Sequence, residues 1–124
     1  MKLTRLLVVL AALVSLHAVA AGTALASTVD DCQAQLATLR ADTVAAQNSF
    51  ANQKDFTGSV AKLDAAGAKL AAGKNADAVG KLSDFQTTLN ALASAPKAKI
   101  DPAVAQALSE DAQGVIDCIN TIAD

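Results

Sequence analysis

The sequence has no tryptophan or tyrosine, and its only histidine and only methionine, His17 and Met1, both lie near the N-terminus. The rest of the chain therefore has no imidazole for a Ser-His-Asp or Cys-His catalytic centre or for a zinc site. It also has no histidine or methionine ligand for haem, which excludes the haem-binding class of small exported helical bundles. We expect no catalytic residue, no metal site and no cofactor, so we expect that the protein is not an enzyme.

Large apolar side chains are also scarce. After residue 26, leucine, isoleucine, valine and phenylalanine together make up 21 of 98 residues, which is close to the level below which chains tend to be disordered. Alanine supplies most of the remaining apolar character. Because alanine is the best helix former but buries little area, the composition predicts a narrow helical domain with a thin core.

The N-terminus has the features of a secretory signal peptide. Lys2 and Arg5 precede an apolar run over 6–14, which is too short to span a bilayer of about 30 Å, and residues 24–26 form an A-x-A cleavage signal. We therefore expect a cleaved signal peptide over 1–26 and a mature domain over 27–124. A cut after Ala20 and an uncleaved membrane anchor are the alternatives.

This interpretation places the mature protein in the periplasm or outside the cell, with no stable membrane anchor. Lipid attachment at Cys32 is disfavoured because Asp30 and Asp31 directly precede it, where lipoprotein signals need small or apolar residues. Loss of Lys2 and Arg5 leaves 8 basic and 12 acidic residues, so the net charge changes from −2 to −4. An acidic chain of this kind argues against nucleic acid as a partner.

Apolar residues recur at alternating steps of three and four along four segments of the mature chain, as on the buried faces of helices. Thr28 followed by Asp31 is a variant of the capping box, so we predict a first helix over about 29–49. The second stripe begins at Phe56. It stops at Gly73, and glycine is the residue most often found just beyond a helix C-terminus.

Two further helices are predicted downstream. Asn75 is expected to cap the third helix, which ends before Pro96. Asp101 and Pro102 then place a capping residue directly before a proline at the first helical position, as at the start of a fourth helix.

Four helices with short connections predict an all-α fold, an antiparallel up-down-up-down four-helix bundle. In this topology Cys32, near the start of the first helix, and Cys118, near the end of the fourth, lie at the same pole. In an exported protein we expect them to form a disulfide, closing a loop of 86 residues and stabilising the fold by roughly 4 to 5 kcal/mol. The alternatives for Cys118 are a buried free thiol and a catalytic or metal-binding thiol.

The stretch KLDAAGAKLAAGKNADAVGKLSDF, which begins at Lys62, resembles the FIMAH domain. The resemblance covers about 56–119, and the matching residues are mostly apolar and turn positions. FIMAH domains are small helical modules usually found as appendages of secreted microbial enzymes and surface proteins. The resemblance implies a helical accessory role, such as attachment to a polysaccharide or a cell surface, and it implies no catalytic residue.

Gly67 lies on the apolar stripe of the second helix, where a larger side chain is expected and where glycine costs about 1 kcal/mol relative to alanine. Close approach of a neighbouring helix is the favoured explanation. The alternative is a pocket for a small apolar ligand. Its lining would be Phe56, Leu63, Gly67, Leu82 and Phe85.

Charged residues recur on two of the predicted helices. The acidic stripe consists of Glu110, Asp117 and Asp124, and the basic stripe consists of Lys62, Lys69, Lys74 and Lys81. Solvated faces of an amphipathic bundle are the favoured interpretation, and docking stripes are the alternative.

These observations lead to one main functional hypothesis. We expect an exported, non-enzymatic interaction or accessory module of the cell envelope or extracellular space, whose partner is an unknown protein or polysaccharide. A carrier or sequestering protein for a small apolar ligand is the first alternative. A secreted enzyme inhibitor is the second, by analogy with other helical bundles.

Overall fold

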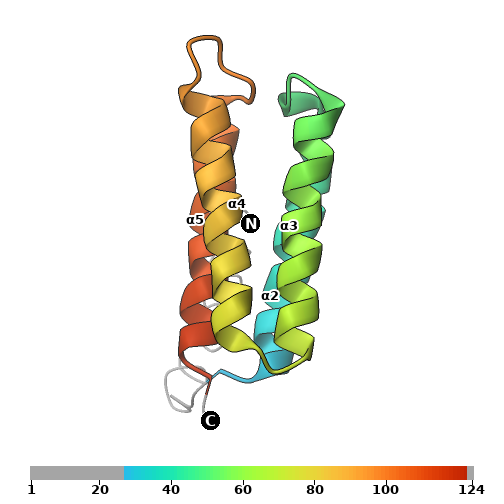
Figure 1. Ribbon diagram of the computed structural model, residues 1–124, viewed down its shortest axis with the longest axis vertical. Coiled ribbons are helices and arrows are strands. Elements are labelled where there is room, and N and C mark those ends of the chain that lie inside the picture. The colour runs from blue at the N-terminus through green and yellow to red at the C-terminus, as the bar shows by residue number, and fades with distance from the viewer. Residues whose placement is uncertain (1–26, 123–124) are drawn as a thin grey trace, which may run out of the picture.

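The computed structural model describes residues 27–122, and within this range the fold is all-α (Figure 1). Its α-helices are α2 (Val29–Ala45), α3 (Gln53–Ala71), α4 (Asn75–Ser94) and α5 (Pro102–Asn120). Each helix packs against the next one in sequence, and α5 returns to pack against α2. The predicted antiparallel up-down-up-down four-helix bundle is therefore confirmed.

Helix α2 begins where the sequence predicts. The Thr28 hydroxyl accepts a hydrogen bond from the backbone N–H of Asp31 at 3.2 Å, and the Asp31 carboxylate accepts one from the N–H of Thr28 at 3.1 Å. This reciprocal pair is a capping box that satisfies two backbone donors. Hydrogen bonding to the Asp31 carboxylate, first from the backbone N–H of Thr28 and then from its side chain, lowers the pKa of Asp31 below its usual value of 3.8.

The C-terminus of α2 differs from the prediction. The helix ends at Ala45 rather than near residue 49, and a short 3-10 turn, η1 (Gln47–Ser49), follows it. Phe50 then leaves the helical path and forms an antiparallel bridge with Ile100 in the connection between α4 and α5. Pairing between two loops that are distant in sequence thus takes the place of the last turn of the predicted helix. Phe50 is buried, but it lies in a loop.

The bridge closes the pole at the top of Figure 1. The N–H of Ala51 donates to the carbonyl oxygen of Lys99 at 2.8 Å, and the N–H of Asp101 donates to that of Ser49 at 3.1 Å. Beneath the bridge, the rings of Phe50 and Phe56 pack edge to face with their centroids 5.5 Å apart. The backbone hydrogen bonds hold the two loops of this pole together, and the ring contact joins the first loop to α3.

The turn between α3 and α4 confirms one prediction and corrects another. Gly73 has φ +76°, and the N–H groups of Gly73 and Lys74 donate to the carbonyl oxygens of Leu70 and Lys69, which is a Schellman motif. Because α4 restarts directly after this motif, Lys74 occupies the N-cap position, and the prediction that Asn75 caps the helix is wrong. Asn75 is the first helical residue, and its Oδ1 is buried without a hydrogen-bond partner among the described residues.

The core is thin, as the composition predicts, and alanine contributes to it on three helices. Ala66, Ala78, Ala105 and Ala112 are each at most 1 % exposed. Phe85 is the largest fully buried side chain. Small side chains at these positions allow neighbouring helices to approach closely.

The predicted signal peptide, 1–26, lies outside the described residues. Between residues 27 and 122 there is no helix with the length and apolar character needed to cross a bilayer.

Candidate interaction site

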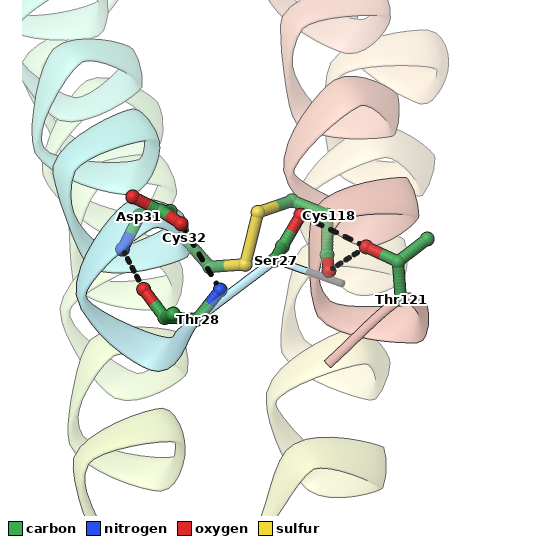
Figure 2. Close-up of a disulfide and its surroundings, with 6 residues drawn as sticks. All are labelled: Ser27, Thr28, Asp31, Cys32, Cys118 and Thr121. Carbon is green, nitrogen blue, oxygen red and sulfur yellow. Dashed lines mark hydrogen bonds between the residues drawn. A yellow bond between two sulfur atoms is a disulfide. The ribbon is translucent and has the colours of Figure 1, made fainter. Parts of the chain in front are cut away.

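The predicted disulfide between Cys32 and Cys118 is present and joins α2 to α5 (Figure 2). Their Cα atoms are 5.7 Å apart, a usual separation for a disulfide, and Cys32 is fully buried. Close by, the Thr121 hydroxyl donates to the carbonyl oxygen of Cys118 at 2.8 Å and lies 2.9 Å from the Ser27 hydroxyl. The disulfide therefore fixes α2 and α5 to each other at the pole opposite the Phe50–Ile100 bridge.

The five residues of the predicted ligand pocket come from α3 and α4. Leu63, Leu82 and Phe85 are each at most 1 % exposed and belong to the core. Phe56 lines a surface groove of about 520 Å³ between α2 and α3, whereas Leu63 and Gly67 line a smaller one of about 190 Å³ between the same helices. The structure thus divides these residues between the core and the α2–α3 surface.

Gly67 faces α2. A Cβ atom at this position would lie 3.5 Å from Cδ2 of Leu36, which is ordinary van der Waals contact. The side-chain amide of Gln33 donates to the carbonyl oxygen of Gly67 at 3.1 Å. Side chains of α2 therefore pack directly over this glycine.

The two α2–α3 grooves meet at an ion pair. Arg40 donates to both carboxylate oxygens of Asp64, at 2.6 and 3.4 Å, and both side chains are about half exposed. The hydrogen bond to Asp64 and the charge of its carboxylate raise the pKa of Arg40 above its usual value. Val44, which is 41 % exposed, lines the wider groove, where the positive and negative charges of the ion pair cancel.

The basic stripe lies beside acidic residues. Lys69 and Lys81 line a groove between α3 and α4 together with Asp77 and Asp84. Helices α3 and α4 together contain four lysines and four aspartates, so these two helices carry no net charge. The lysines are Lys54, Lys62, Lys69 and Lys81, and the aspartates are Asp55, Asp64, Asp77 and Asp84.

A different groove, of about 340 Å³, runs between α2 and α5, the two helices joined by the disulfide. Leu39 and Val115, which are 1 % and 2 % exposed, form its base. Three exposed acidic residues, Asp42, Glu110 and Asp111, line it. The other lining residues are Gln35, Thr38 and Gly114.

The charge of α2 and α5 is strongly one-sided. Helix α2 has three aspartates and one arginine, and α5 has two aspartates, one glutamate and no basic residue, so together they carry a net charge of −5. The one arginine, Arg40, is paired with Asp64 of α3. The bundle therefore has an acidic half, made of α2 and α5, and an electrically balanced half, made of α3 and α4.

The acidic carboxylates of this half are not arranged as a metal site. Among residues 27–122, no group of three or more histidine, cysteine, aspartate or glutamate side chains could hold a metal ion. The groove is open to solvent along the helices, and its chemistry is that of a contact surface with an apolar base and an acidic rim.

The sequence places Glu110 in an acidic stripe, for which a solvated face is the favoured interpretation and docking the alternative, and it does not predict the α2–α5 groove. The predicted acidic stripe continued from Glu110 to Asp117 and to Asp124, and Asp124 lies outside the described residues. The groove instead pairs Glu110 with Asp42, which is far away in sequence. Two signals were available: the absence of basic residues from α5, and Gly114 in the middle of that helix.

The family model of the FIMAH domain matches residues 29–117. The chain belongs to the FIMAH domain family. The match begins at Val29, so it includes α2, whereas the resemblance seen in the sequence covers only about 56–119. The match spans most of the disulfide-linked bundle. No curated protein and no solved structure matches the chain. Membership of this family makes the bundle a helical accessory module.

Proposed function

We propose that this FIMAH domain is an exported, non-enzymatic module that binds another protein of the cell envelope or extracellular space. In this proposal residues 1–26 are a cleaved signal peptide and 27–124 form the working domain. The Cys32–Cys118 disulfide supports a location in an oxidising compartment, because disulfides persist in secreted and periplasmic proteins and are rare in the cytosol.

The groove between α2 and α5 is the observation that carries the proposal. It combines a hydrophobic base, Leu39 and Val115, with an exposed polar rim, which is the general arrangement of a protein interface. The disulfide and the packing of the bundle hold its two walls together. A rigid groove of this kind loses little conformational entropy when a partner binds.

A protein partner is favoured over a polysaccharide because the described surface exposes only a small part of any aromatic ring for stacking on a sugar. Phe50, Phe56 and Phe85 are at most 9 % exposed, and the sequence has no tryptophan or tyrosine. Aromatic residues provide the flat apolar surfaces on which rings stack. Contacts in the α2–α5 groove would instead involve carboxylates, amides and aliphatic side chains.

The proposal can be tested by filling the groove without disturbing the bundle. Gly114 lies in the groove, and a Cβ atom there would meet nothing within 4 Å, so the substitution Gly114→Gln is expected to fold and to block the site. Gly58 on α3 is the matched control, because it is also helical and exposed, with nothing within 4 Å.

Wild type, Gly114→Gln and Gly58→Gln would be exported from the producing cell, and the proteins that co-purify with each would be compared by mass spectrometry. We expect one component to be present with wild type and Gly58→Gln and absent with Gly114→Gln. Retention of all components by Gly114→Gln, or no component at all with wild type, would contradict the proposal.

A further inference from the structure

We infer that the α2–α5 groove docks a protein segment that presents lysine or arginine side chains. This inference rests on the proposed function and names the chemistry of the partner at the same site. It follows from the base of the groove, from its rim and from the charge of the two helices that form it.

The rim provides acceptors for cationic groups. Asp42 on one wall and Glu110 and Asp111 on the other are all exposed. Glu110 accepts a hydrogen bond from Gln106 at 3.0 Å, and no described residue donates a hydrogen bond to the side chains of Asp42 or Asp111. Carboxylates in this state can accept charge-assisted hydrogen bonds from ammonium or guanidinium groups.

The lining of the groove matches the other part of such side chains. Lysine and arginine have an aliphatic stem that packs on apolar surface while the charged end stays in a polar environment. Leu39 and Val115 lie almost wholly buried at the base, so the stem would pack mainly on the aliphatic parts of lining side chains such as Gln35 and Thr38, while the rim carboxylates accept the charged end. Gly114 has no side chain and leaves open space beside this surface, so a partner backbone can approach α5 closely.

The wider electrostatic field favours the same partner. The net charge of −5 on α2 and α5 contrasts with the zero net charge on α3 and α4, so a basic segment is attracted to the half of the bundle that contains the groove. Attraction of this kind raises association rates and determines orientation, and salt weakens it.

Two fluorescein-labelled decapeptides test the inference directly. In the first, five lysines alternate with five alanines. In the second, each lysine is replaced by 2,4-diaminobutyrate, which keeps the charge but shortens the stem by two methylenes. Binding to the oxidised bundle would be measured by fluorescence anisotropy at low and high salt.

We expect the lysine peptide to bind more tightly than its short-stem analogue. A fully buried methylene changes affinity by about fourfold, so partial burial of the stems against the lining of the groove predicts a difference of several-fold. Affinity should fall as salt is raised, because the rim contacts are exposed to solvent. Failure of the lysine peptide to bind, or equal affinity for both peptides, would overturn the inference.

Charge variants locate the site. The groove variant neutralises the three rim residues with Asp42→Asn, Glu110→Gln and Asp111→Asn. The control variant makes the same change of three charges on the other half with Asp55→Asn, Asp77→Asn and Asp84→Asn.

An exposed ion pair changes an equilibrium constant by roughly 1.5- to 5-fold, so the groove variant should bind the lysine peptide about tenfold more weakly. An equal loss in both variants would show non-specific attraction and overturn the inference. Circular dichroism would confirm that both variants fold.

The same variants separate this inference from the proposed function. If Gly114→Gln loses the co-purifying component while the groove charge variant retains it, the groove binds a partner but the partner is not basic. If both variants lose the component and the control retains it, the inference stands. If both variants retain the component, the inference and the proposed function fail together.

Discussion

Replacing helical glycines by alanine should stabilise this bundle at positions where the structure leaves room for a side chain. Gly58, Gly80 and Gly114 lie within α3, α4 and α5, respectively, and a Cβ atom at each would meet nothing within 4 Å. Alanine loses less backbone entropy than glycine when a helix forms, so each substitution should raise the free energy of unfolding by about 0.5 to 1 kcal/mol.

The other two glycines between residues 27 and 122 provide comparisons for this prediction. At Gly67 the added Cβ would be 3.5 Å from Leu36, so alanine should also be tolerated there. At Gly73 the backbone has φ +76°, which alanine adopts poorly, so Gly73→Ala should lower the free energy of unfolding by about 1 kcal/mol. The series therefore predicts a change of sign that depends on backbone conformation.

Urea unfolding at neutral pH, followed by circular dichroism, provides the assay. With a slope of about 1 kcal/mol/M, which suits a small domain, each stabilising substitution should raise the midpoint by about 0.5 to 1 M. The three open sites are on different helices, so the triple variant should gain about 1.5 to 3 kcal/mol if the effects add. A lower midpoint for Gly58→Ala or Gly80→Ala, or a higher one for Gly73→Ala, would refute this reasoning.

Three further predictions concern the bonds that hold the helices together. The disulfide closes a loop of 86 residues, so its reduction should lower the free energy of unfolding by about 4 to 5 kcal/mol. Urea unfolding with and without reductant measures this difference, and a value below about 1 kcal/mol would contradict the prediction. Because Arg40 and Asp64 are about half exposed, Asp64→Asn should cost less than about 1 kcal/mol, and a much larger loss in the same assay would show that the pair has a structural role. The pKa of Asp31 is lowered in the fold, so its contribution to stability is present at neutral pH and is lost as the pH falls through that lowered pKa. The Asp31→Asn variant should therefore lose less stability than wild type between pH 5 and pH 2. If the free energy of unfolding falls equally in both proteins over this range, the capping-box assignment is contradicted.

The features that sequence predicted correctly are local or follow from topology. Thr28 and Asp31 are three residues apart and form their capping box within one turn. Gly73 ends α3 because only a residue tolerant of positive φ suits its position. The pairing of Cys32 with Cys118 required only that the first and last helices be antiparallel and that both residues lie near the same pole.

The features that sequence reasoning missed depend on contacts between distant segments. Nothing in the chain between Thr43 and Phe50 stops a helix, and α2 ends early because Phe50 pairs with Ile100 in another loop. Asn75 resembles a capping residue, but the preceding Schellman motif places Lys74 at the cap. The α2–α5 groove could not be recognised either, because its rim joins Asp42 to residues on a helix about 70 positions later.

The most direct test of the account is to map the binding face residue by residue. The oxidised domain, labelled with nitrogen-15, would be titrated with the lysine decapeptide while amide chemical shifts are recorded. Binding in the α2–α5 groove should change the shifts along α2 from Gln35 to Asp42 and along α5 from Glu110 to Val115. Changes confined to α3 and α4, or a uniform response over the whole surface, would contradict the claim that the α2–α5 groove is the binding site.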